Sequence, residues 1–103
     1  MADYRVNTRN DLPRIGEMLG LSTEQITDMR AVSAVLPFKV NDYVIEHLID
    51  RDDIPHDPIF QLTFPQRGML EDDDFQRMRD LVTADTPDAE IRLAADEVRA
   101  KLN

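Results

Sequence analysis

The spacing of apolar positions predicts amphipathic helices along most of the chain. Apolar side chains recur three and four residues apart, as they do on one face of a helix, and the strict alternation of a half-buried strand is weak. The segments with this spacing cover about residues 11–19, 22–36, 41–49, 71–82 and 86–102. We therefore expect an all-α fold, a small bundle of about five helices that forms a single helical domain over residues 1–103.

Start and stop signals bound the first two helices. Asn10 is a candidate N-cap for the first, and Gly20 suits a left-handed residue at its end. Ser22, followed three residues later by Gln25, has the spacing of a capping box at the start of the second helix. Pro37 then ends that helix, because the residue before a proline is disfavoured in the helical conformation.

The apolar stripes define the expected core. On the first four helices the stripe positions are Leu12, Ile15, Ile26, Met29, Val32, Ile45, Leu48, Phe75, Met78 and Leu81. On the last helix they are Ile91, Ala94, Ala95, Val98 and Leu102. Asn41 is a candidate cap for the third helix.

A proline-bounded segment between the third and fourth helices departs from this pattern. Asp57 before Pro58 is typical of a cap followed by a first helical turn. From Phe60 to Pro65 the sequence FQLTFP alternates apolar and polar residues, which predicts an extended arm. We expect its apolar side chains to be partly exposed and to mark the contact with a partner.

Composition narrows the classes of function. The 103 residues include 12 Lys and Arg against 21 Asp and Glu, a formal net charge of −9, which argues against nucleic acid and anionic membranes as partners. There is no cysteine, so the chain supplies no disulfide and no thiolate ligand. No apolar stretch is long enough for a signal peptide or a membrane span, and a cytoplasmic protein is the expectation.

The polar clusters do not predict a catalytic or metal site. Asp50, Asp52, Asp53 and Asp57 surround His56, but the spacing lacks the alternation and the central glycine of a calcium loop. We interpret these aspartates as turn and cap residues. The acidic run from Glu71 to Asp74 suits the start of a helix, and His47 has no second histidine at metal-ligand spacing.

Residues 37–70, with the two acidic residues that follow them, contain a series of short elements in a distinctive order. They are His47-Leu48-Ile49-Asp50, then Pro55-His56-Asp57-Pro58-Ile59, then Gln61 with Pro65-Gln66, and finally Met69-Leu70-Glu71-Asp72. This series resembles the N-terminal region of the lysine 2,3-aminomutase family. The resemblance extends over about residues 11–74 and is most specific over residues 47–66.

The resemblance implies a parent enzyme that uses S-adenosylmethionine, a [4Fe-4S] cluster and pyridoxal phosphate to move an amino group between adjacent carbons of an amino acid. The family's cluster motif, CxxxCxxC, cannot occur in a chain without cysteine, and its cofactor-binding lysine lies far downstream. The implied role of this chain is therefore that of the non-catalytic helical region before the catalytic barrel, with no cofactor of its own. Its implied partners are that barrel and, in a homo-oligomer, a second subunit.

We expect the proline-bounded segment to make this interdomain contact. The candidate contact residues are His56, Asp57, Pro58, Ile59, Phe60, Leu62, Phe64, Pro65 and Gln66. An alternative that the residues leave open is an independent acidic helical module that binds another protein. A CxxxCxxC motif in the sequence that follows residue 103 would distinguish the two.

Overall fold

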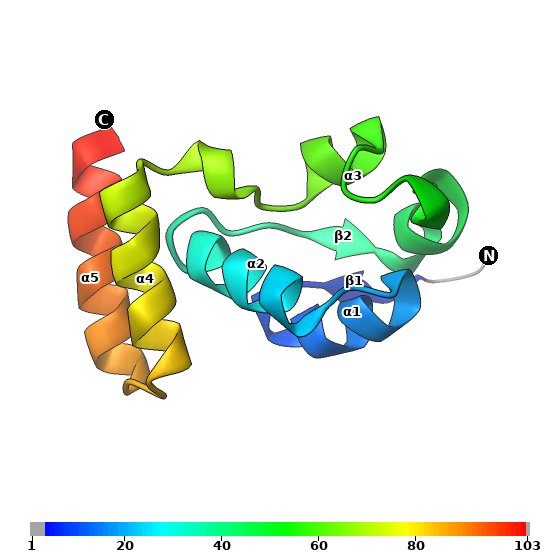
Figure 1. Ribbon diagram of the computed structural model, residues 1–103. Coiled ribbons are helices and arrows are strands. Elements are labelled where there is room, and N and C mark those ends of the chain that lie inside the picture. The colour runs from blue at the N-terminus through cyan, green and yellow to red at the C-terminus, as the bar shows by residue number, and fades with distance from the viewer. Residues whose placement is uncertain (1–3, 103) are drawn as a thin grey trace.

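Helices dominate the computed structural model, which describes residues 4–102 (Figure 1). The α-helices are α1 (Leu12–Leu19), α2 (Thr23–Val35), α3 (Pro58–Thr63), α4 (Asp72–Thr83) and α5 (Asp88–Leu102). Short turns of 3-10 helix are η1 (Arg9–Asp11), η3 (Arg51–Asp53) and η4 (Arg67–Met69), and a π-helical turn, η2, spans Val44–Leu48. Two short strands, β1 (Val6–Asn7) and β2 (Val40–Asn41), complete the structure. The prediction of a small all-α bundle is confirmed.

The structure confirms the predicted capping box at the start of α2 and the predicted glycine at the end of α1. The Oγ of Ser22 accepts a hydrogen bond from the Gln25 amide at 3.0 Å, and the Gln25 side chain accepts one from the Ser22 amide at 2.8 Å. Gly20 ends α1 with a φ of 68°, the left-handed conformation that favours glycine. The prediction of Asn10 as the cap of α1 is wrong, because the 3-10 turn η1 precedes the helix and puts Asp11 at the N-cap position.

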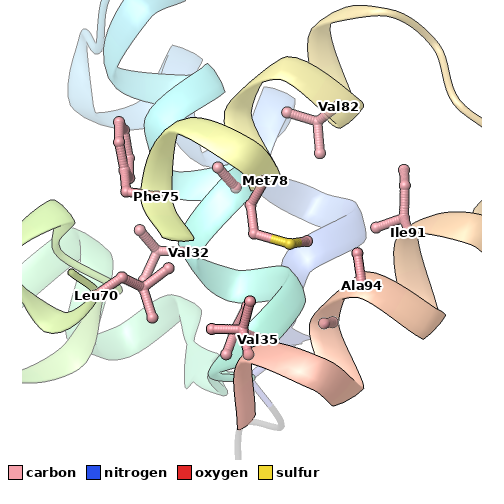
Figure 2. Packing of buried hydrophobic residues seen from close by; sticks show 11 residues of the cluster. Val32, Val35, Leu70, Phe75, Met78, Val82, Ile91 and Ala94 are labelled. Carbon is pink, nitrogen blue, oxygen red and sulfur yellow. The ribbon is translucent and has the colours of Figure 1, made fainter. Parts of the chain in front are cut away.

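The C-terminal half of the core lies between α2 and the helical hairpin formed by α4 and α5. Phe75, Met78 and Val82 of α4 belong to one buried cluster with Val32 and Val35 of α2, and Figure 2 shows Val82 at the end of this cluster near Ile91. The α5 stripe of Ile91, Ala94, Ala95 and Val98 is buried against them, as predicted. Leu102 is the exception, 45% exposed at the end of the helix.

The N-terminal half of the core is closed by the two strands, which pair antiparallel, Val6 with Asn41 and Asn7 with Val40. Asn7 is fully buried, and its Nδ2 donates to the Asp42 carboxylate at 2.8 Å. Arg14 of α1 donates to both carboxylate oxygens of Asp42, at 3.0 and 2.9 Å. Hydrogen bonds lower the pKa of Asp42 from 3.8 to about 2, with the larger effect from Arg14 and the smaller from Asn7. This network joins the strands to α1.

The third predicted helix is the least regular element. Asn41 does cap it, since its side chain accepts from the Val44 amide at 3.0 Å. The turn is π-helical, however, with the Ile49 amide donating to the Val44 carbonyl at 3.2 Å. A π turn holds more residues than an α turn, so Ile45 and Ile49 are buried while Leu48 rotates outward and is 48% exposed. The prediction of Leu48 as a core residue is therefore wrong.

The other predicted core positions are buried or partly buried. Leu12, Ile15, Met29, Val32, Ile45, Phe75 and Met78 are buried, whereas Ile26 and Leu81 pack at the edges of the two clusters. Within residues 4–102, no helix combines the length and the apolar character that crossing a bilayer requires.

Candidate functional site

The segment predicted as an extended arm is largely the short helix α3. Asp57 caps it, with its Oδ2 accepting from the Phe60 amide at 2.8 Å, and Pro58 occupies the first helical position, as the sequence predicts. The prediction that residues 60–63 are extended is wrong, because alternation of apolar and polar residues over so short a segment does not distinguish a strand from a helix. Phe60 and Phe64 are four residues apart, a spacing that serves a helix face as well as one face of a strand.

The structure divides the nine candidate contact residues between the core and the surface. Asp57, Phe60, Phe64 and Pro65 are buried; Ile59 and Gln66 are partly buried; His56, Pro58 and Leu62 are exposed. The expectation of partly exposed apolar side chains therefore holds for Leu62, whereas both phenylalanines belong to the N-terminal core.

Aromatic packing fixes the inner face of α3. The Phe64 ring lies 5.2 Å from the Phe60 ring and 5.4 Å from the Phe38 ring, between centroids. At these separations and tilts the rings are in favourable contact. Phe64 is only 1% exposed, so the end of the helix is anchored in the core.

The outer face of α3 carries an unburied apolar side chain. Leu62 is 84% exposed, more than any other large hydrophobic residue described. Beside it lies a hollow of about 630 Å³ that is lined by Pro58, Gln61, Leu62 and Gln66. Hydrogen bonds hold both glutamines, from Gln61 Nε2 to the Pro55 carbonyl and from Gln66 Nε2 to the Phe64 carbonyl, each at 3.1 Å. We call these four residues the α3 outer face.

The aspartates before α3 organise the loop. Asp57 also accepts from the Asp50 amide at 3.2 Å, and Asp50 accepts from the Asp52 amide at 3.0 Å. These are the turn and cap roles that the sequence predicts. Over the part of the chain that the structure describes, no three His, Asp or Glu side chains come together in a group that could hold a metal ion.

Asp74 and His47, two of the remaining polar candidates, have structural partners. Asp74, in the acidic first turn of α4, is buried, and its carboxylate accepts from the Lys101 ammonium at 2.9 Å, which raises the pKa of Lys101. Glu71 stands at the N-cap position of α4. His47 packs against the Tyr43 ring at 4.9 Å between centroids.

A second feature, which sequence reasoning missed, is a cleft of about 650 Å³ between η1, the end of α2 and the first turn of α5. Its charged lining consists of Arg9, Lys39, Arg92 and Arg99 against the single carboxylate of Asp88. We call it the basic cleft. Ala34, Pro37, Phe38 and Ile91 form its apolar walls.

Two of these arginines donate hydrogen bonds to backbone carbonyls of α2. Arg99 donates from Nε to the Val35 carbonyl at 2.8 Å and from Nη2 to the Ala34 carbonyl at 3.2 Å, which satisfies carbonyls of the last turn. Arg9 donates from Nε to the Arg30 carbonyl at 3.1 Å. Its Nη2 is buried and has no hydrogen-bond partner among the described residues. Burial lowers the pKa of Arg9, and the positive charge of the neighbouring Arg30 lowers it further by a smaller amount. The carboxylate of Asp88 opposes this shift.

The basic cleft gives no signal in the sequence because its cations come from positions far apart in the chain. Arg9, Lys39 and Arg92 belong to three separate segments, and each alone has the appearance of an ordinary surface residue. Only the packing of α5 beside the end of α2 brings them together.

Comparisons of the chain with protein-family models, with curated proteins and with solved structures find no match.

Proposed function

We propose that this chain is the non-catalytic helical domain of a larger cytoplasmic radical enzyme similar to the lysine 2,3-aminomutases. In the proposal it packs on the catalytic barrel through the α3 outer face. The observation that carries the docking role is the exposure of Leu62 beside two buried phenylalanines of the same segment. A solvent-exposed apolar side chain on a helix whose other face is buried in the core is typical of a surface that a partner covers.

The position of this surface supports the proposal. The most specific part of the resemblance, residues 47–66, runs from η2 through α3 and includes all four outer-face residues, with Gln66 at its end. The buried Phe60 and Phe64 hold the helix in one place before a partner binds. A preformed surface of this kind loses little conformational freedom on association.

The residues present do not fit the cofactors of the proposed parent. A chain without cysteine offers no thiolate for an iron–sulfur cluster. The proposal therefore assigns S-adenosylmethionine, the cluster and pyridoxal phosphate to the parent's barrel, along with its 1,2-amino migration. This domain contributes packing and positioning.

An independent acidic interaction module is the second candidate. The net charge of −9 favours it, because such a charge steers association with a basic protein surface. It would use the same exposed leucine for a different partner.

The exposed leucines of the chain provide a matched test. Leu62 of α3 and Leu93 of α5 are 84% and 65% exposed, so serine at either position should leave the fold intact. In a titration against the separately produced catalytic barrel, the wild-type chain and Leu93→Ser should bind alike, and Leu62→Ser should bind about tenfold more weakly. Equal binding by all three chains would contradict docking through α3, and no binding to the barrel by any of them would favour the independent module.

A further inference from the structure

The basic cleft concentrates positive charge in a molecule that is otherwise strongly acidic. It collects four of the chain's 12 Lys and Arg residues and only one of its 21 carboxylates. We propose that the cleft binds a small oxyanion, a phosphate or carboxylate group on a small molecule, with Arg9, Lys39 and Arg92 as donors. This site is separate from the α3 outer face and does not depend on the proposed docking role.

Two of the three proposed donors are available to a ligand. Lys39 and Arg92 are exposed at the edge of the cleft, and within residues 4–102 neither side chain forms an ion pair. Arg99, by contrast, is occupied by the α2 carbonyls and by Asp96. Its role is to hold one wall of the cleft.

Arg9 supplies the most specific argument for an anion. Its guanidinium is held by the bond from Nε to the Arg30 carbonyl, while Nη2 is buried without an acceptor among the described residues. A buried donor of a charged group is unfavourable unless an acceptor reaches it. A small movement of this flexible side chain toward an oxyanion in the cleft would provide that acceptor. The negative charge would also offset the repulsion between Arg9 and Arg30.

The shape of the cleft favours a small molecule over an extended acidic peptide. Its cations converge from η1, from the segment after α2 and from α5 onto one hollow, and they do not form a stripe along the surface. A volume of about 650 Å³ lies within the usual range for small-molecule sites. The apolar walls formed by Ala34, Pro37, Phe38 and Ile91 would pack against the body of the ligand and strengthen the ionic contacts by excluding water.

The test is a titration of the intact chain with inorganic phosphate, pyrophosphate and citrate at low ionic strength, followed by amide chemical shifts. We expect saturable binding of at least one of these anions, with the largest shifts around residues 8–10, 37–39 and 88–92. A preference for phosphate and pyrophosphate would identify a phosphoryl group as the ligand chemistry, and a preference for citrate would identify a carboxylate. Either preference supports the site.

Three exposed positions provide the variants. Arg92→Gln should weaken binding about tenfold or more, because it removes a charged donor. Arg51→Gln, outside the cleft, makes the same change in charge and should leave the affinity unchanged. Asp88→Asn removes the only carboxylate of the lining while keeping a residue that suits a helix start, and it should tighten binding several-fold.

Three outcomes would overturn the proposal. The first is the absence of saturable binding of any of the three anions. The second is an equal loss of affinity in Arg92→Gln and Arg51→Gln, which would show an effect of net charge alone. The third is tighter binding of a hexaglutamate peptide, titrated in parallel, than of any of the three small anions.

Discussion

Replacing Phe64 by alanine should destabilise the protein strongly, because the side chain anchors α3 in the N-terminal core. Phe64 is 1% exposed and contacts the rings of Phe38 and Phe60. Truncating a buried phenylalanine costs about 3–5 kcal/mol, which includes the lost transfer free energy and the cavity that remains. A domain of this size is stable by about 5–15 kcal/mol, so the loss is a large fraction of the total.

Urea unfolding followed by far-UV circular dichroism measures this change in the free energy of unfolding. Phe64→Leu, which keeps most of the apolar volume, should show a smaller loss and remains measurable if the alanine variant does not fold. Leu62→Ala is the matched control two residues away, and at 84% exposure it should change stability by about 0.5 kcal/mol or less.

The refuting result is a loss of less than about 1 kcal/mol for Phe64→Ala, close to that of Leu62→Ala. Residues 60–64 would then form a mobile arm without an anchored inner face. The preformed α3 outer face, and the docking role built on it, would be wrong.

Three further predictions concern the strands, a helix end and the absent thiolates. The pKa of Asp42 is lowered to about 2 by Arg14 and Asn7. The ionised carboxylate therefore contributes fully to the free energy of unfolding above pH 3.8, and this contribution is lost as the pH falls toward 2. The stability of Asp42→Asn, measured by acid unfolding, should lack this pH-dependent loss. Gly20→Ala should cost about 1–2 kcal/mol in urea unfolding because φ is 68° with open space around the position, whereas Gly68→Ala, also in open space, should cost nothing or stabilise slightly. Anaerobic reconstitution with iron and sulfide should leave the purified chain colourless, because it has no cysteine, and a stoichiometric cluster spectrum would contradict the proposed division of roles.

The sequence predicts those parts of the fold that depend on local signals. The Ser22–Gln25 capping box, the left-handed Gly20 and the Asp57-Pro58 helix start all depend on residues within one turn of each other. The stripes of α4 and α5 are long enough for a period of 3.6 to be distinguished from a period of 2.

The errors arise where a segment is short or where tertiary packing decides. Phe60 and Phe64 fit one face of a strand or of a helix equally well, but burial of both rings with Leu62 exposed between them fits only the helix. The π turn that exposes Leu48 has no signature in composition. Two strands of two residues each give no periodicity, and they form because the buried Asn7 meets Asp42 and the distant Arg14.

Part of the candidate functional sites could likewise be predicted from local sequence, and part depends on tertiary packing. The proline-bounded segment was identifiable because a cluster of large apolar residues between two prolines is conspicuous in the sequence. Which of its side chains face outward depends on the helix that they form, and the sequence predicts the start of that helix at Asp57-Pro58 but not its continuation over residues 60–63. The basic cleft exists only because helices distant in the chain pack side by side.

The proposed function can be tested on the coding sequence beyond residue 103. We expect the reading frame to continue into a barrel-sized segment that contains a CxxxCxxC motif near its start. A stop codon directly after Asn103, with no such motif in the same frame, would contradict the account and leave the independent acidic module as the better explanation of the exposed α3 outer face.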